Sequence, residues 1–115
     1  MKDSYRVVVI GGGVVGASVL YHLAKFGWTD VAIVERSILT AGSSWHAAGG
    51  IHALNADPSM AALQAYTIDL LSEIQEESGQ NIGLHMAGGI SVASAPDRWE
   101  WLQASYRIFQ TIGIE

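Results

Sequence analysis

Residues Val7–Gly16 read V-V-V-I-G-G-G-V-V-G, an apolar run that ends in glycines at the G-x-G-x-x-G spacing, Gly11, Gly13 and Gly16. The β-branched residues of the run predict a short strand that is buried on both faces. Gly11 permits a sharp turn at the end of the strand, Gly13 lets the backbone approach a pyrophosphate, and Gly16 lets the following helix pack closely. The segment therefore predicts a dinucleotide-binding turn between a strand and a helix.

The residues after this turn supply the context that the glycine spacing lacks by itself. Apolar residues recur at three- and four-residue intervals through Ala24, which predicts a helix, and Gly27 lies where such a helix would end. Backbone N–H groups around Val14 and Val15 would then face the phosphates. A second apolar run, Val31–Val34, ends in Glu35, about 20 residues beyond the glycines, where a carboxylate accepts hydrogen bonds from a ribose. The alternative is an ordinary packing turn, because glycine is frequent in this chain.

The composition excludes several other classes of protein. The 115 residues include no cysteine and carry a formal net charge of −5, so the chain is no disulfide scaffold and no nucleic-acid partner is expected. An uncharged run, Val7–Tyr21, follows two cations as a signal peptide would, but its glycines disfavour a membrane or signal helix. We expect a cytoplasmic protein with no membrane partner. The four histidines show no metal-ligand spacing, so no metal site is expected.

The second half of the chain predicts three more elements. Asp57 and Pro58 open a helix that ends near Ser78 and Gly79, and Pro96 opens another. Between the helices, Ile82–Met86 and Gly89–Ala93 read as two short strands joined by Ala87 and Gly88, which predicts a hairpin. In the last helix the candidates for burial are Trp99, Leu102, Tyr106, Ile108 and Phe109.

The loop after Glu35 carries the second candidate site. His46 follows Glu35 by eleven residues, and such a chain spans at most about 35 to 40 Å, enough to reach the far end of an extended dinucleotide. Small residues in between permit close approach of the backbone, and two serine hydroxyls can donate to phosphate oxygens. A neutral imidazole at the end of this loop is a candidate nucleophile toward the cofactor. The alternative is that His46 only fills space beside Trp45.

Several stretches of the sequence together resemble one family. G-G-G-V-V-G-A-S-V-L-Y-H-L-A-K-F-G, V-E-R, L-T-A-G-S-S-W-H-A-A-G-G and E-E-S-G-Q-N-I-G-L-H-M-A-G-G-I-S-V-A resemble the flavin domain of the dimethylglycine and sarcosine dehydrogenase family, within the D-amino-acid-oxidase-like flavoproteins. The W-H-A-A-G run is more specific than the glycine spacing. The resemblance implies FAD joined covalently to His46. One departure is Leu20, which stands where many relatives have alanine.

The resemblance also implies a fold and an activity. The expected fold is α/β: residues 1–115 form the N-terminal part of a Rossmann-like domain of the FAD/NAD(P)-binding type, as a βαβ unit, then a helix, a β-hairpin and a helix, incomplete as it stands. The implied activity is oxidation of small N-methylated amino acids such as dimethylglycine or sarcosine, with folate bound by a C-terminal region in some relatives. The cofactor-binding residues are expected to be Gly11, Gly13, Val14, Val15, Gly16, Glu35, Arg36, Gly42, Ser43, Ser44, His46, Ala47, Ala48, Gly49 and Gly50.

Three alternatives to this function stay open. A related amino-acid oxidase would hold FAD without a covalent bond, an NAD-dependent dehydrogenase would use the same ribose contact, and a dinucleotide-binding module would have no catalytic role. The expected partners are a small amine substrate and the remainder of the same polypeptide. No catalytic residue is assignable in these 115 residues, and we expect the isolated segment to be inactive.

Overall fold

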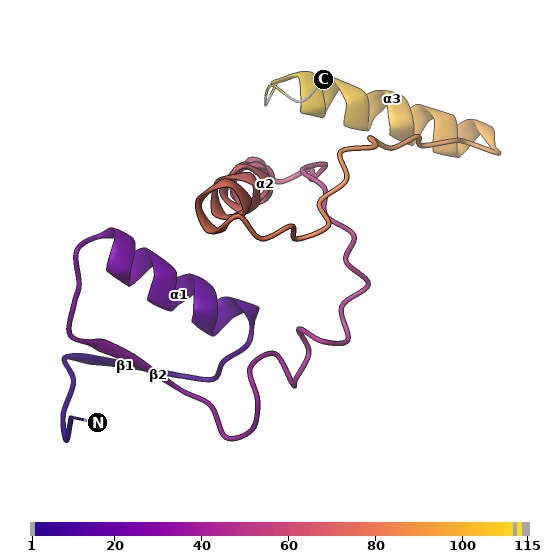
Figure 1. Cartoon of the computed structure of the whole chain (residues 1–115). Coiled ribbons are helices and arrows are strands. Elements are labelled where there is room, and N and C mark those ends of the chain that lie inside the picture. Colours follow the sequence, from indigo (N-terminus) through magenta and orange to yellow (C-terminus); the bar gives the residue numbers. More distant parts are fainter. Residues whose placement is uncertain (1, 112, 114–115) are drawn as a thin grey trace. The chain divides into compact units, whose positions relative to one another are not determined.

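The computed structural model describes residues 2–111 and 113, and the chain divides into two compact units, Met1–Gly50 and Ile51–Glu115 (Figure 1). The first unit contains strand β1 (Val7–Ile10), helix α1 (Val14–Lys25) and strand β2 (Val31–Val34). The second contains helix α2 (Pro58–Ser78) and helix α3 (Pro96–Thr111). A pair of parallel strands and three helices confirm the predicted α/β class.

The first unit is a βαβ unit. β1 and β2 pair in parallel, with Val7 opposite Val31 and Ile10 opposite Val34. Parallel neighbours need a crossover connection, and α1 supplies it while contacting both strands (Figure 1). This arrangement places the turn after β1 beside the end of β2, so residues from both strand ends meet at one edge.

The ends of α1 lie where the sequence predicts them. Gly13 is the N-cap in an extended conformation, and Phe26 is the C-cap. Gly27 follows at a φ of +85°, and its N–H donates to the carbonyl of Ala24 at 2.9 Å, which satisfies a carbonyl of the last turn. No residue of α1 is fully buried, and the side chain of Val15 is 74% exposed.

The caps of α2 also follow the prediction. The Asp57 side chain accepts a hydrogen bond from the Met60 N–H at 2.9 Å, and Pro58 occupies the first helical turn. Gly79 ends the helix in the left-handed conformation, with a φ of +65°. Ala61 and Leu70 are the buried residues of this helix.

The predicted hairpin is wrong. The structure has no strand in Ile82–Met86 or Gly89–Ala93. A tight two-residue hairpin turn of the commonest type needs a positive φ at both central residues, and of the pair Ala87 and Gly88 only Gly88 has one, at +70°. An isolated pair of strands is also marginally stable without a third strand or a covering helix. Ile90 is accordingly 93% exposed.

The predicted burial in α3 is also wrong for most of its apolar side chains. The side chains of Trp99 and Tyr106 are each 58% exposed, and Ile108 is exposed as well, whereas Leu102 and Phe109 are half-buried. Within the described part of the chain, α3 packs against no other helix or strand, so its apolar face has nothing to be buried against. The start of the helix at Pro96 agrees with the sequence.

Candidate cofactor-binding site

The turn between β1 and α1 depends on glycine at two positions. Gly11 has a φ of +107° and donates its N–H to the carbonyl of Val34 at 2.8 Å, which ties the turn to the end of β2. A side chain at Gly16 would overlap the carbonyl oxygen of Gly11 and approach a methyl group of Val9. The helix can therefore begin this close to the strand only with glycine at position 16.

Gly12 has a structural role that the sequence pattern did not predict, because this position is unspecified in the G-x-G-x-x-G spacing. Gly12 is buried, and a Cβ there would lie 2.5 Å from Leu39 Cδ2 and 3.2 Å from Glu35 Cβ. Its N–H donates to Glu35 Oε2 at 2.8 Å. The run of three consecutive glycines was the available signal for such close packing.

Glu35 is fixed by two backbone donors at the end of β2. Oε2 accepts from the Gly12 N–H, and Oε1 accepts from the Ser37 N–H at 2.9 Å. These hydrogen bonds, with that from Gly12 the strongest, lower the pKa of the Glu35 carboxyl below its ordinary value. The side chain is half-buried and ionised at neutral pH. Each oxygen has further acceptor capacity, which suits ribose hydroxyls.

The N-terminus of α1 receives a hydroxyl from a distant residue. The N–H of Val14 donates to Ser44 Oγ at 2.8 Å. A Cβ on Gly13 would lie 3.1 Å from the same oxygen, so Ser44 lies directly against the glycine turn. The structure thus brings together Gly13, Val14 and Ser44, which the sequence analysis assigned to one pyrophosphate site.

The loop from Thr40 to His46 is folded into successive turns. Thr40 donates its N–H to the carbonyl of Gly12 at 2.9 Å and has a φ of +68°, which is unusual for a β-branched residue. Trp45 then donates to the carbonyl of Thr40 at 3.1 Å, and His46 to that of Ser43 at 3.2 Å. The bond from Thr40 attaches the start of this loop to the glycine turn, and the other two bonds fold the loop between Thr40 and His46.

One contact of the His46 imidazole favours a particular tautomer of the neutral ring. Its Nδ1 lies 3.0 Å from the carbonyl oxygen of Gly42. A carbonyl oxygen only accepts hydrogen bonds, so Nδ1 carries the proton and Nε2 of the neutral ring has the free lone pair. His46 is exposed and Trp45 is 77% exposed, and the two alternatives for His46 both stay predictions.

Of the remaining predicted residues, Ala47 donates its N–H to the carbonyl of Ser44 at 3.4 Å. Arg36 and Ala47–Gly50 are exposed, and Gly49 has a φ of +75°. Their contacts to a cofactor stay predictions. Within residues 2–111 and 113, no three His, Cys, Asp or Glu side chains lie together as metal ligands would, and none of the helices is long and apolar enough to cross a membrane.

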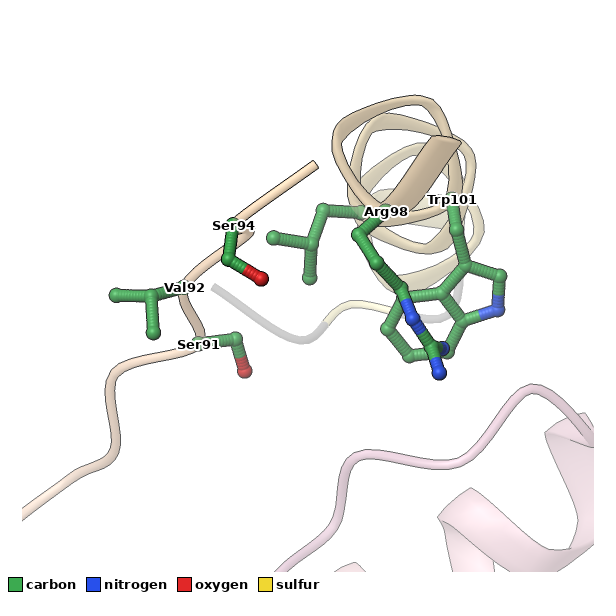
Figure 2. Close-up of a pocket in the computed structure, with 6 residues that line it drawn as sticks. Ser91, Val92, Ser94, Arg98 and Trp101 are labelled. Atoms are coloured by element: carbon green, nitrogen blue, oxygen red, sulfur yellow. The ribbon is translucent and has the colours of Figure 1, made fainter. Parts of the chain in front are cut away.

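A separate hollow lies in the second unit, with a volume of about 330 Å³ (Figure 2). It is lined by the segment before α3 and by the first turns of that helix, with Ser91 and Ser94 on one side and Arg98 and Trp101 on the other. None of the predicted cofactor-binding residues lines it.

A parallel βαβ unit whose helix starts at a glycine turn, with a carboxylate at the end of the second strand, is the arrangement that dinucleotide-binding proteins use. Comparison with protein families identifies the particular kind. Residues 6–115 match the family described as FAD dependent oxidoreductase, and the chain belongs to that family.

Three relatives illustrate the range of the family. The chain is 44% identical to mitochondrial dimethylglycine dehydrogenase of Rattus norvegicus, over 84% of this chain and 11% of the relative. It is 37% identical to mitochondrial sarcosine dehydrogenase of Homo sapiens, over 100% of this chain and 13% of the relative. It is 33% identical to the mitochondrial pyruvate dehydrogenase phosphatase regulatory subunit of Mus musculus, over 95% of this chain and 12% of the relative. The chain thus spans about an eighth or less of the length of these proteins.

Proposed function

We propose that this chain forms the first part of the FAD site of an oxidoreductase that acts on small N-methylated amino acids. The family supports the cofactor, and the similarity to a dimethylglycine dehydrogenase and a sarcosine dehydrogenase supports the substrate class. When bound, FAD supplies the acceptor for the two electrons that leave the amine. The chain covers only a small part of those relatives, and no residue of the described part is assigned to binding the amine.

The residues present fit the pyrophosphate and adenosine parts of FAD. The N-terminus of α1 carries partial positive charge, and with no side chain on Gly13 the Ser44 hydroxyl lies against this turn, where a hydroxyl can donate to a phosphate oxygen. Glu35 presents an ionised carboxylate whose position is fixed by two backbone N–H groups. We assign the phosphates to Gly11–Gly16 together with Gly42–Ser44, and the ribose to Glu35 beside Arg36.

We further propose that His46 carries FAD covalently and that the bond is made by Nε2. The observation that carries this assignment is the contact between His46 Nδ1 and the carbonyl of Gly42. That contact holds the ring in the tautomer with a lone pair on Nε2, and an unprotonated nitrogen is what a nucleophile requires. Ala47–Gly50, with small side chains, would then run beside the flavin.

The test is acid denaturation of the full-length protein, followed by separation of protein from supernatant. We expect the flavin to stay with the protein, on a peptide that spans Trp45 to Ala48, and nuclear magnetic resonance of that peptide to place the bond at Nε2. His46→Ala should release all flavin on denaturation, while His52→Ala, a change at a nearby exposed histidine, should not. Quantitative release of flavin from the wild type would contradict covalent attachment.

A second candidate is a flavoprotein that oxidises no amine. It is favoured by the similarity to a regulatory subunit over 95% of this chain. Anaerobic addition of dimethylglycine or sarcosine separates the two functions, because an oxidase or dehydrogenase would bleach the visible absorbance of its flavin. A protein that keeps its flavin and is bleached by neither amine would support the second candidate.

A further inference from the structure

Helix α1 has no local residue that can cap its N-terminus. Gly13 occupies the N-cap position without a side chain, and the first turn contains no acidic residue. The first four N–H groups of a helix have no partner within it, and a nearby Ser, Thr, Asp or Asn usually supplies one. Here the hydroxyl comes from Ser44, thirty residues further along the chain, which accepts from the Val14 N–H at 2.8 Å.

Ser44 also belongs to the turn that presents His46. The Trp45 N–H donates to the carbonyl of Gly42 at 3.2 Å, the His46 N–H donates to that of Ser43 at 3.2 Å, and the His46 ring contacts Gly42 as described. These bonds join Gly42 to His46 in one short turn. A contact that fixes Ser44 against α1 therefore also fixes the position from which the imidazole extends.

We propose that Ser44 is a positioning residue that caps α1 from a distance and so sets the place of His46 relative to the phosphate-binding turn. This inference rests on the proposed covalent role of His46 for its functional consequence, but the capping contact exists without the cofactor. A hydroxyl can accept from the Val14 N–H and at the same time donate to a phosphate oxygen. The contact with Val14 is therefore compatible with a hydrogen bond from Ser44 to a phosphate oxygen.

The chain offers a matched control in the same loop. Ser37 is exposed, and its side-chain hydroxyl makes no hydrogen bond within the part of the chain that the structure describes, although its N–H contacts Glu35. Ser37→Ala makes the same chemical change as Ser44→Ala, the loss of one hydroxyl group, at a position where that hydroxyl has no hydrogen-bond partner among the described residues. Ser44→Thr keeps the hydroxyl and should restore whatever Ser44→Ala loses.

The first measurement is hydrogen exchange in the full-length apoprotein. Ser44→Ala should make the Val14 amide exchange about five- to tenfold faster, the ratio expected for loss of one capping hydrogen bond. The amides of Trp45 and His46 should also exchange faster, because the turn loses its attachment to α1. Ser37→Ala and Ser44→Thr should match the wild type. Unchanged exchange at Val14 in Ser44→Ala would overturn the proposal.

The second measurement is the rate of covalent attachment after FAD is added to the apoprotein. Ser44→Ala should slow it by about ten- to a hundredfold, since misplacement of a reacting group by about 1 Å has that effect. Ser44→Thr should recover the rate, because threonine keeps the hydroxyl that accepts from the Val14 N–H. An unchanged rate in Ser44→Ala would overturn the positioning role. Release of flavin from the wild type on acid denaturation would refute the covalent bond. The hydrogen-exchange measurement would still test whether Ser44 caps α1.

A substitution at Gly13 also tests the contact between Ser44 and the N-terminus of α1. Gly13 has a negative φ of −81°, so alanine can adopt its backbone conformation, but its Cβ would press on Ser44 Oγ at 3.1 Å. Gly13→Ala should therefore speed exchange at Val14 as Ser44→Ala does. Wild-type exchange in Gly13→Ala together with wild-type exchange in Ser44→Ala would leave no role for the hydroxyl.

Discussion

Replacing Gly16 by alanine tests whether close contact between α1 and β1 decides the geometry of the cofactor site. The added Cβ would overlap the backbone carbonyl oxygen of Gly11 and lie 3.4 Å from a methyl group of Val9. A backbone carbonyl cannot rotate away as the end of a flexible side chain can. The first turn of the helix would have to move away from the strand, and with it the N–H groups that face the phosphates.

The magnitude follows from two opposing effects. Alanine in place of glycine stabilises a helix by about 1 kcal/mol. Overpacking against atoms that cannot yield costs about 3 kcal/mol, the upper part of its usual range. The net loss is about 2 kcal/mol, which corresponds to a fall in the midpoint of thermal unfolding of about 4–8 °C for a domain of 150–250 residues.

The assay is thermal unfolding of the full-length flavoprotein, followed through the rise in flavin fluorescence, together with the flavin content of the purified variant. Ala17→Gly is the matched control, because Ala17 is exposed and adjacent in the same helix. It should cost about 1 kcal/mol through helix propensity alone and keep its flavin. A Gly16→Ala protein that unfolds at a higher temperature than the wild type, with full flavin content, would refute the argument from close contact.

Three further predictions concern single contacts. Gly12→Ala should destabilise the protein by about 1–2 kcal/mol in the same thermal assay, less than Gly16→Ala, because the tightest contact is the mobile end of Leu39. Glu35→Gln should remove part of the pH dependence of the free energy of unfolding. The pKa of the Glu35 carboxyl is lowered in the folded protein, so the ionised carboxylate stabilises the fold. This stabilisation is complete above the ordinary pKa of 4.5 and is lost as the pH falls through the lower pKa of the folded protein. Urea unfolding from pH 3 to 6 should thus show a wild-type minus Glu35→Gln difference that shrinks toward acid, and a constant difference would contradict this. Asp57→Ala should cost about 1 kcal/mol by removing the cap of α2, whereas Asp69→Ala, at an exposed position within that helix, should cost less.

The elements whose ends are decided by neighbouring residues could be predicted from the sequence. Gly27 and Gly79 end their helices at positive φ, and Asp57 caps α2 through a residue three positions away. Each of these contacts involves backbone within one helical turn, so a short stretch of sequence contains all the necessary information. The same holds for the parallel strands, whose β-branched runs flank a helix of crossover length.

The hairpin could not be predicted in this way, because pairing of strands depends on what covers them. The alternation of Ile90 and Val92 with the small residues Gly89, Ser91 and Ala93 is typical of a strand that is buried on one face. In the structure both side chains are exposed, at 93% and 86%, so pairing of the two segments would bury no apolar surface of these side chains to offset the entropy lost by ordering the backbone. A period-two pattern indicates that a segment would have one apolar face if it were extended. The segment becomes a strand only where another strand pairs with it and another element covers that face.

In the candidate site too, the sequence predicted which residues take part, but it did not predict all of the contacts between them. The sequence predicted that the glycine turn and the loop after Glu35 contribute to one site, and Gly13, Val14 and Ser44 do lie together, while their contacts to phosphate stay a prediction. It did not predict that Gly12 supports Glu35, since the glycine spacing leaves that position unspecified. Nor did it predict that Ser44 replaces the missing cap of α1, because that bond joins residues thirty positions apart.

These long-range bonds make the glycine turn dependent on the segment that follows β2. The Gly11 N–H donates to Val34, the Gly12 N–H to Glu35, and the Val14 N–H to Ser44, while the Gly12 carbonyl accepts from Thr40. Four backbone groups of the turn are thus held by the end of β2 and the loop beyond it. The glycines permit the turn, but these partners determine its shape. A change between Glu35 and His46 should therefore alter the phosphate-binding turn itself, even where the changed residue touches no part of the cofactor.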